Sequence, residues 1–401
     1  MLTLEEAHRR LLAHAHLTDA ERVPLAEALG RVLVEPRVVA AVDVPPFANS
    51  AMDGFALRAA DAPGTLRVVG EVSAGAGELP TVEPGTAVRI MTGAPIPPGA
   101  DTVVPLEEAT ESAGIVSIPE PTLSGRHVRA AAHDTRAGEE ICIDDGLTPA
   151  KIGVLASIGI GEVAVRRRPV VAILSTGNEL VGPGEPLGPG QIHDANSAAL
   201  AAAVVDAGGV PLLLPRLRDE AWPIESALAG AARDADLVVT SGGVSVGQHD
   251  YVRAVLERSG SLDFWRIAVQ PGKPLAVGAL GGATVIGLPG NPVSALVTFE
   301  LFVRPVIRAM QGLAGDGRLH VRAVPTERMS KDPARRAFLR VGVWREDGDI
   351  HARPAGGQLS SQLRPLADGN ALLIVPEGAD AAEPPLAYEA IVFEPLLLTG
   401  R

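Results

Sequence analysis

The chain has 401 residues, a formal net charge of −13 and a hydrophobic content of 46%. Its length predicts two to four domains, because one ordinary core rarely organises so many residues. The acidic balance argues against nucleic acid as a partner, and the apolar content excludes a disordered chain.

We find no run of about 18 apolar residues, which a membrane span would need, and no apolar signal region near the N-terminus. We therefore expect a cytoplasmic protein without membrane contact. The single cysteine, Cys142, excludes an intrachain disulfide framework and a multi-cysteine metal site. Because Cys142 stands in the alternating, strand-like stretch EEICIDDG, we expect a buried, inert thiol.

The first part of the chain predicts a discontinuous helical domain. Residues 3–16 and roughly 24–33 carry Leu and Ala at helical spacing. A third helix is predicted over 148–159, where a threonine N-cap is followed by proline at the first helical position. We expect these helices to pack together as residues 1–43 and 137–168.

Residues 44–136 predict a small inserted β domain, since short β-type runs are separated there by Gly and Pro clusters. Its turns present Asp53, Thr92, Arg129 and Asp134. Taken alone, Asp53 fits an ordinary Asp-Gly turn, and Asp134 beside a histidine fits a surface pair. The chain has no HxxxH or HExxH spacing, so we expect no zinc site.

Residues 169–315 alternate strands with helices, which predicts a doubly wound α/β domain. Ligands of such sheets bind outside the carboxyl ends of the strands. Polar residues stand at these predicted ends: Ser175, Thr176 and Glu179 in STGNEL, Asp219 in RLRDE, and Ser241 in TSGGVSVGQHD. By themselves, Glu179 fits an acid in a first helical turn and Asp219 fits a helix cap.

The segment TSGGVSVGQHD is a glycine-rich turn between a strand and a helix. Backbone amides at such a turn, with serine hydroxyls, receive anions in many α/β proteins. The Walker lysine and the G-x-G-x-x-G pattern are both missing. An ordinary turn with an aspartate N-cap is an equal alternative. The residues concerned are Ser241, Gly242, Gly243, Ser245, Gly247 and Asp250.

The segment GLPGNPVS predicts another helix start at the same sheet edge. Asn291 is the expected cap, Pro292 the first helical residue, and Gly290 frees the backbone beside them. Two such helix starts favour an elongated ligand with several negative charges. Short alternating strands then return over residues 318–401 and predict a C-terminal β domain.

Six segments, taken in order, resemble one family, the molybdopterin molybdenumtransferases of the MoeA type, also found as the C-terminal half of gephyrin. They are PPFANSAMDGFALR, RIMTGAPIPPGADTVVPLEE, AILSTGNEL, TSGGVSVGQHDY, VQPGKPLAVG and GLPGNPVSALVTF. The resemblance covers essentially the whole chain. It implies a multidomain α/β plus β protein whose α/β domain binds molybdopterin.

The resemblance also implies the reaction. Molybdenum from molybdate enters adenylated molybdopterin, the adenylate is hydrolysed and AMP is released, with Mg²⁺ assisting. It implies a homodimer in which the β insertion of one subunit completes the site of the other. Molybdopterin adenylyltransferase and molybdoenzyme maturation factors are further expected partners.

Matching positions carry the family's functional residues onto this chain. The implied catalytic acids are Asp53, Asp134, Glu179 and Asp250, of which Asp134, Glu179 and Asp250 suit Mg²⁺. The implied substrate-binding residues are Thr92, Arg129, Ser175, Thr176, Asp219, Ser241, Gly242, Gly243, Ser245, Gly247, Lys273, Pro289, Gly290, Asn291 and Pro292.

The chain departs from the family pattern where RAAAHD lacks an arginine run and where Gln270 replaces a lysine. Arg266 and Arg340 are candidates to compensate for these lost cations.

Three alternatives remain open: the adenylyltransferase built on the same α/β domain, a tungsten-inserting paralogue, and a non-catalytic pterin-binding scaffold. The additional β domains argue against the first, and the retained acids argue against the last.

Overall fold

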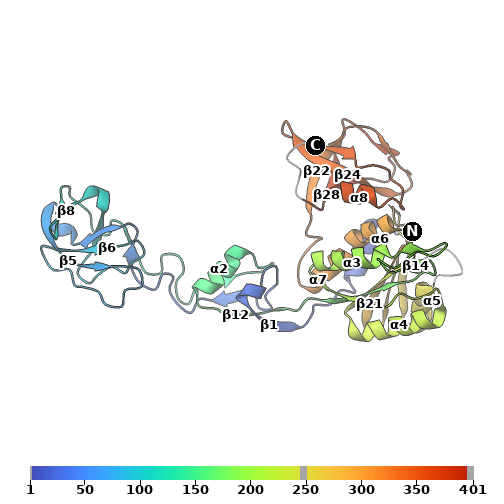
Figure 1. The fold of residues 1–401 in the computed structure, drawn as a ribbon, viewed down its shortest axis with the longest axis horizontal. Helices are drawn as coiled ribbons and strands as arrows, with labels where there is room; N and C mark the ends of the chain where they lie inside the picture. Colours follow the sequence, from blue (N-terminus) through green and yellow to red (C-terminus); the bar gives the residue numbers. More distant parts are fainter. Residues whose placement is uncertain (1, 244–250, 395–401) are drawn as a thin grey trace. The chain divides into compact units, whose positions relative to one another are not determined.

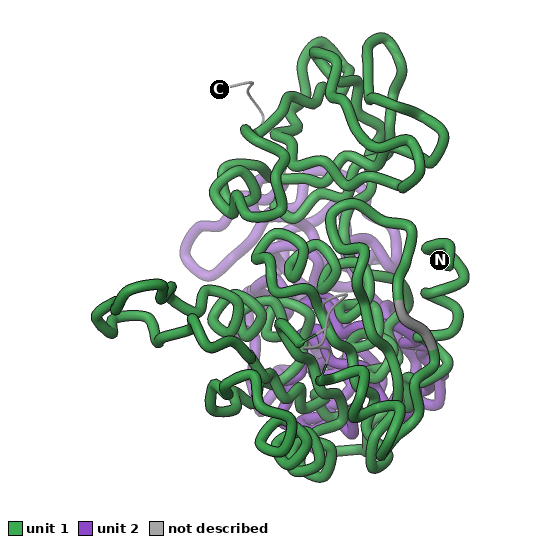
Figure 2. The backbone as a smooth tube through the Cα atoms, turned by 90° about the vertical axis from the view of Figure 1, so that its right-hand side faces the viewer, with its two compact units in different colours: residues 1–21, 166–401 green, residues 22–165 purple. Residues whose placement is uncertain are grey.

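The computed structural model describes residues 2–243 and 251–394 (Figure 1). The chain divides into two compact units, coloured in Figure 2: unit 1 contains residues 1–21 and 166–401, and unit 2 contains residues 22–165. Among the described helices, none combines the length and the apolar composition that crossing a bilayer requires. The predicted fold class, a multidomain α/β plus β protein, is confirmed; the finer four-part division stays a prediction.

Unit 2 is built around a six-stranded sheet in the order β7-β4-β6-β5-β9-β8. Its strands are β4 (Gly54–Leu57), β5 (Gly64–Val72), β6 (Thr86–Ile90), β7 (Thr102–Pro105), β8 (Thr110–Ser112) and β9 (Ile115–Ile118). Buried side chains cover both faces, with Phe55 and Leu57 on one and Ala56 and Val88 on the other. This is the inserted β domain that the sequence predicts.

Two short antiparallel pairs and one helix complete unit 2. The pairs are β3 (Asn49–Ser50) with β10 (Val128–Arg129), and β2 (Arg37–Val39) with β11 (Glu140–Cys142). Helix α2 (Pro149–Ser157) begins as predicted, because Thr148 accepts a hydrogen bond from the Lys151 amide.

The helix predicted over residues 24–33 is wrong. The chain forms strand β1 (Ala20–Pro24), which pairs with β12 (Glu162–Arg166), and the short 3₁₀ turn η1 (Leu25–Glu27). Backbone amides along this stretch donate to distant carbonyls, such as Leu25 to Gly161 at 3.1 Å. Tertiary pairing therefore replaces the helix that the spacing of Leu and Ala favours.

Cys142 also differs from expectation, since it is exposed on β11. Strand β11 is only three residues long and pairs on one side, with β2. The alternation of the sequence is correct, but Ile143 is the buried neighbour and Cys142 faces outward.

The α/β part of unit 1 is a six-stranded sheet in the order β16-β13-β17-β21-β20-β18 (Figure 1). The strands are β13 (Val170–Ser175), β16 (Val210–Leu213), β17 (Leu237–Ser241), β18 (Ser261–Trp265), β20 (Ala276–Leu280) and β21 (Ala283–Leu288). Strands β13, β16, β17 and β21 are parallel. Strand β20 pairs antiparallel with β21, and β18 pairs antiparallel with β20 and so runs in the direction of the first four. The predicted doubly wound α/β domain is confirmed, with this antiparallel edge added.

Helices cover both faces of this sheet. Val171 and Ile173 face α3 (Ala195–Asp206) and a continuous helix of α6 (Pro292–Thr298), the π-helical turn η4 (Phe299–Val303) and α7 (Arg304–Met310). Ala172 and Leu174 face α4 (Ala221–Asp234) and α5 (Tyr251–Ser259). Strand β13 is apolar at Val171–Leu174 because side chains on both of its faces are buried under helices.

The N-terminal helix α1 (Leu4–Leu12) packs on the same core through Ala7 and Leu11. It lies beside α7, whereas we expected residues 1–43 to pack with residues 137–168. The burial of one face explains the amphipathic pattern that predicts this helix.

The C-terminal part of unit 1 is a second six-stranded sheet, in the order β19-β24-β25-β22-β28-β26. Because β26 also pairs with β24, five of these strands close into a barrel. The elements are β19 (Val269–Gln270), β22 (Leu319–Pro325), β24 (Arg336–Glu346), β25 (Asp349–Pro354), β26 (Ala371–Val375) and β28 (Tyr388–Val392), with helix α8 (Arg364–Asp368) and the separate pair β23 (Met329–Ser330) and β27 (Ala381–Ala382).

A charged clamp fixes the amino ends of β13 and β17. Both terminal nitrogens of Arg167 donate to Asp236 at 2.6 Å, and the same carboxylate accepts the Val170 amide at 2.7 Å. Burial alone would raise the pKa of Asp236, but the hydrogen bonds from Arg167 and Val170 outweigh burial and lower it. The carboxylate therefore stays ionised while it holds the two strands together.

We predict that Asp236→Asn lowers the free energy of unfolding of unit 1 by about 1–3 kcal/mol, because Arg167 loses its charged acceptor. Urea denaturation would measure this loss. The lowered pKa means that the stabilisation is present above about pH 3.9 and is lost as the pH falls toward the folded-state pKa. Asp234→Asn is the control, since Asp234 is exposed two residues away. Equal free energies of unfolding for Asp236→Asn and Asp234→Asn would contradict a stabilising role of the Arg167–Asp236 clamp.

Candidate functional site

The carboxyl ends of β13, β17 and β21 meet at a cavity of about 580 Å³. In the parallel register, Ser175 stands opposite Ser241, and Ser241 opposite Leu288. The residues that follow these strands must therefore lie side by side at one edge of the sheet. The cavity has the size of a small-molecule site and the position where α/β proteins bind ligands.

Nine residues singled out from the sequence line this cavity together. They are Thr176, Glu179, Ser241, Gly242, Gly243, Pro289, Gly290, Asn291 and Pro292. The structure thus brings the ends of three strands and the start of α6 to a common point, whereas the other predicted helix start, near Asp250, lies outside the described residues.

One amide that the sequence analysis missed joins the loops. Asn196, in the first turn of α3, donates through Nδ2 to Ser241 Oγ at 2.7 Å and to the Gly290 carbonyl at 2.8 Å. Since Ser241 follows β17 and Gly290 follows β21, this side chain fixes the distance between the two loops. Ser241 accepts from Asn196, so its own hydroxyl proton can be donated to a ligand.

Asp194 holds the start of α3 in the cavity wall and is only 2% exposed. Its Oδ1 accepts from the Ser197 amide at 3.0 Å, and its Oδ2 from the Ser197 hydroxyl at 2.5 Å. Ser175 lies behind this wall, 2.8 Å from Ser197 Oγ. Ser175 therefore supports the wall and is not itself a lining residue.

Thr176 presents a buried hydroxyl to the cavity. Its Oγ1 has no hydrogen-bond partner among the described residues, and the side chain is 6% exposed. Buried hydroxyls are normally paired, so this group is suited to bind a ligand oxygen. Gly242 has a φ of +91°, and a Cβ there would lie 2.8 Å from the Thr176 carbonyl oxygen. Only glycine permits this close approach of the two loops.

The helix start at α6 differs in one detail from expectation. Asn291 occupies the N-cap position and Pro292 the first helical position, but the Asn291 side chain makes no capping bond. Its Nδ2 instead donates to Ser360 Oγ at 3.0 Å, and the Val293 amide donates to the Ser360 carbonyl at 3.3 Å. The C-terminal barrel thereby reaches the cavity, where Ser361 forms part of the wall.

Glu179 lies in an exposed loop ahead of the two-residue strand β14 (Leu180–Val181), which pairs with β15 (Ile192–His193). The simple alternative of an acid in a first helical turn does not hold, because no helix begins there. Glu179 is one of the residues that line the cavity, and no hydrogen bond or ion pair engages its carboxylate among the residues described. It is therefore available to a cation.

Asp219 and Lys273, two further sequence candidates of unit 1, do not line the cavity. Asp219 is half-buried in the loop after β16, where its amide donates to Asn178 Oδ1 at 3.3 Å. Lys273 is exposed, and the adjacent Pro274 is the lining residue. Ser245, Gly247 and Asp250 lie outside the described residues.

The compensating role considered for Arg340 is not supported. The guanidinium is 1% exposed and donates to the carbonyls of Gly357 and Leu359 at 3.2 and 3.3 Å. Burial lowers the pKa of Arg340 to about 10. Arg340 is buried and is not among the residues that line the cavity.

In unit 2, Asp53 and Thr92 form a direct pair. Asp53 Oδ1 accepts the Thr92 amide at 2.6 Å and the Thr92 hydroxyl at 2.7 Å. These bonds, the amide bond first, lower the pKa of Asp53 and keep it ionised. Thr92 gives both of its donors to the carboxylate, so in this structure its hydroxyl proton is not directed at an oxyanion.

Arg129 and Asp134 are both exposed in unit 2. Arg129 stands on β10 opposite Asn49, whose buried Oδ1 has no partner among the described residues. The Asp134 amide donates to the Val44 carbonyl at 2.9 Å. Within residues 2–243 and 251–394, no group of three His, Cys, Asp or Glu side chains is arranged to hold a metal.

His193, Asp194 and Asn196 line the cavity from one short segment, IHDANS, and were not predicted from the sequence. An aspartate cap followed by serine before a helical run was a usable signal for the start of α3. Nothing in the sequence around Ser361 indicates that it belongs to the cavity, because about 70 residues separate it along the chain from Pro292, the nearest other lining residue.

Three family models match the chain in order. They are the MoeA N-terminal region (domains I and II) over residues 2–159, the probable molybdopterin binding domain over residues 172–309, and the MoeA C-terminal region (domain IV) over residues 322–384.

Curated relatives and a solved structure agree with these models. The chain is 40% identical over 369 residues to molybdopterin molybdenumtransferase 2 of Mycobacterium tuberculosis, covering 88% of this chain and 90% of the relative. It is 38% identical over 410 residues to the Haemophilus influenzae molybdopterin molybdenumtransferase, covering 98% of both. The crystal structure of the molybdopterin biosynthesis MoeA protein from Pyrococcus horikoshii superposes with a TM-score of 0.82 at 32% identity, covering 98% of this chain and 99% of that one. The chain therefore belongs to the molybdopterin molybdenumtransferase family, as its ordered motifs predict.

Proposed function

We propose that this chain is a transferase of molybdenum cofactor biosynthesis, which inserts molybdenum into molybdopterin. Its relatives at 38–40% identity carry that name over nearly their whole length. The observation that carries the proposal is the cavity where three strand ends converge and where Thr176, Ser241 and Asn196 supply polar groups. Such a site binds a small polar ligand at the edge of a parallel sheet.

We further propose that the substrate is adenylated molybdopterin and that AMP is released as molybdenum enters. The hydroxyls of Thr176 and Ser241 would donate to oxygens of the pyrophosphate. Gly242 and Gly290 both line the cavity, and a Cβ at Gly242 would lie 2.8 Å from the Thr176 carbonyl oxygen, so only glycine lets the backbone stand there. Ser245, Gly247 and Asp250 are proposed to extend this site.

The charge of the cavity supports the participation of Mg²⁺. The described wall contains the carboxylates of Glu179 and Asp194 but neither lysine nor arginine. A pyrophosphate or molybdate anion would be repelled there unless a cation accompanied it. Mg²⁺ commonly binds through one or two carboxylates together with substrate phosphates, and Glu179 fits that role. When bound, the ion neutralises phosphate charge. Asp134 and Asp250 are proposed as its other ligands.

The remaining assignments rest on the family resemblance. We propose a cytoplasmic homodimer in which unit 2 of one subunit, with Asp53, Thr92, Arg129 and Asp134, completes the site of the other. Lys273 and Asp219 are proposed to contact the substrate at the edge of the cavity, and Pro289 and Pro292 to shape it. The molybdopterin adenylyltransferase and molybdoenzyme maturation factors are the proposed protein partners.

The first test is AMP release from adenylated molybdopterin in Mg²⁺ buffer. We expect AMP release to depend on molybdate, with metal appearing on the pterin. Glu179→Gln should slow release by about 100-fold, the scale of a lost catalytic acid, base or metal ligand. Glu185→Gln is the matched control, since Glu185 is exposed in the same loop region and pairs with Arg216.

Stimulation by tungstate alone would support the tungsten-inserting alternative. Binding of the adenylate without AMP release, with either oxyanion, would leave only a pterin-binding scaffold and would overturn the enzymatic proposal.

A double-mutant cycle tests the link between the loops of the cavity. We predict that Asn196→Ala and Ser241→Ala each weaken binding of adenylated molybdopterin. Because both changes remove the same contact, we expect a coupling free energy of about 0.5–3 kcal/mol. Calorimetry on the two single variants and the double variant would measure it. Purely additive effects would mean that the contact does not shape the site.

The pairing of Asp53 and Thr92 gives a test in unit 2. Thr92→Val removes the hydroxyl bond but keeps the amide bond, so the pKa of Asp53 should rise part of the way to its usual value. Titration of the Asp53 carboxyl by NMR would measure the change. Thr110→Val, on β8 of the same unit, is expected to leave this titration unchanged. An unshifted Asp53 in Thr92→Val would show that the amide alone determines its ionisation.

A further inference from the structure

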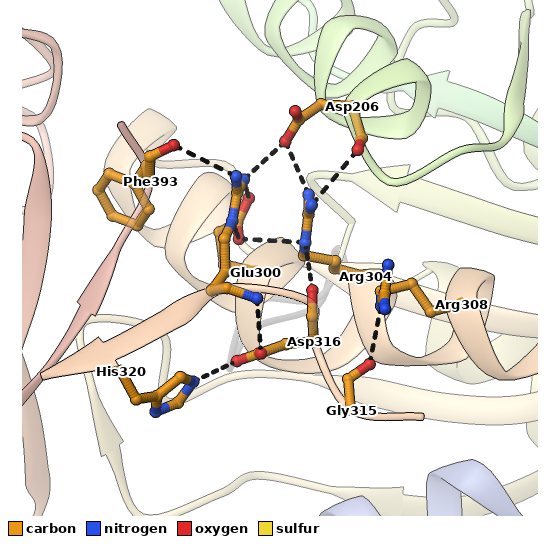
Figure 3. A network of polar contacts seen from close by, with 9 residues as sticks. Asp206, Glu300, Arg304, Arg308, Gly315, Asp316, His320 and Phe393 are labelled. Atoms are coloured by element: carbon orange, nitrogen blue, oxygen red, sulfur yellow. Dashed lines mark hydrogen bonds and ion pairs between the residues drawn. The ribbon is translucent and has the colours of Figure 1, made fainter. Parts of the chain in front are cut away.

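The segment between α7 and β22 is held to the α/β core by a network of charged side chains (Figure 3). Asp206, at the end of α3, accepts from Arg304 at 2.7 Å and from Arg318 at 2.6 Å. Arg318 also pairs with both oxygens of Glu300, at 2.9 and 3.0 Å. Because Glu300 stands in the π-helical turn η4, the network joins α3, η4 and α7 to the approach of β22.

Backbone carbonyls of the same segment enter the network. Arg304 Nε donates to the Asp316 carbonyl at 2.7 Å, and Arg308 Nε to the Gly315 carbonyl at 3.1 Å. Arg318 donates to the Phe393 carbonyl at 3.4 Å and lies 5.8 Å from the centre of its ring. The segment is therefore tied to the core on one side and to the end of the barrel on the other.

His320 stands at the beginning of β22, between two carboxylates. Its Nε2 lies 2.9 Å from Asp316 Oδ2, and its Nδ1 lies 2.6 Å from Glu389 Oε1 on β28. Carboxylates only accept hydrogen bonds, so both ring nitrogens must donate and the ring must be an imidazolium. Burial lowers the pKa of His320, but Glu389 and Asp316 outweigh burial and raise it.

The balance of charges in the network depends on the protonation of the His320 ring. With His320 counted as a cation, the network contains four carboxylates, of Asp206, Glu300, Asp316 and Glu389, and four cations, of Arg304, Arg308, Arg318 and His320. Of these eight, the imidazole alone changes its charge near neutral pH. The other charged or titratable groups around the same cavity, of about 820 Å³, are His8 on α1, Arg322 on β22, Arg336 on β24 and the Tyr388 phenol on β28. Burial lowers the pKa of His8, so it does not replace the lost charge.

The segment that His320 secures positions the C-terminal barrel, and the barrel carries the Ser360 and Ser361 loop. Ser360 binds Asn291 and the Val293 amide at the helix start of the candidate site. Ser361 forms part of the cavity wall. The attachment of the barrel therefore influences how complete this wall is, whatever ligand the cavity binds.

We propose that His320 is a pH-sensitive latch, whose imidazolium holds the Asp316 segment and the Glu389 strand together and whose deprotonation loosens the barrel from the α/β core. A neutral ring keeps one N–H, so one of its nitrogens turns a lone pair toward a carboxylate and that contact becomes repulsive. The stabilisation is complete below the unfolded-state pKa of about 6.5 and is lost as the pH rises through the raised folded-state pKa.

Two measurements on the full chain test this latch. The first is an NMR titration of the His320 ring, which should show a midpoint above about 6.5. The second is hydrogen exchange of the Arg318 amide, which donates to Asp316 Oδ1 at 3.0 Å. After correction for intrinsic exchange, its opening should increase between pH 6 and pH 9, by about tenfold for each unit by which the pKa is raised.

His320→Gln should exchange at pH 6 as the unmodified chain does at pH 9, with no further dependence on pH. His351→Gln is the matched control, because His351 lies on β25 of the same barrel and contacts Trp344. It should keep the pH dependence of the unmodified chain. A ring midpoint at or below 6.5, or the same corrected pH dependence in His320→Gln as in the unmodified chain, would overturn the proposal.

Discussion

The parallel register of β13, β17 and β21 is the constraint on which the rest of the site depends. Since Ser175, Ser241 and Leu288 stand in line across the sheet, the three loops that follow must meet at one point. Glycines allow those loops to touch, and the Asn196 amide sets their spacing. Both faces of the strands are buried. A shift of the pairing register by one residue would therefore turn every core side chain of a strand to the opposite face of the sheet.

Features of this fold that are encoded locally could be predicted from the sequence. Thr148 and Asn291 mark helix starts by their type and position, and the apolar run over 170–175 indicates a strand buried on both faces. Such apolar runs show where the parallel strands end, and the polar residues just after those ends can be picked out as site candidates. For this reason nine of the candidates line one cavity. The resemblance to the family supplied the reaction, which the residues alone do not specify.

What the sequence could not provide depends on contacts between distant segments. The stretch over 24–33 has helical spacing, yet its amides find partners near residues 147–164. Asn291 has the composition of a cap, but Ser360 draws its side chain away. Cys142 is the opposite case, since the alternating sequence around it does form a strand as predicted. Because β11 pairs on one side only, with β2, the thiol faces outward.

The paired strands β1 and β12 stand where the chain passes from unit 1 into unit 2 and returns. The Arg167 amide donates to the Asp19 carbonyl at 2.8 Å, so the outgoing and returning segments are adjacent. Neighbouring ends are the condition under which one domain can be inserted into another without disturbing the host fold. The junction of unit 2 meets this geometric condition, so the length and content of the inserted segment place no demand on the path of the chain through the α/β core.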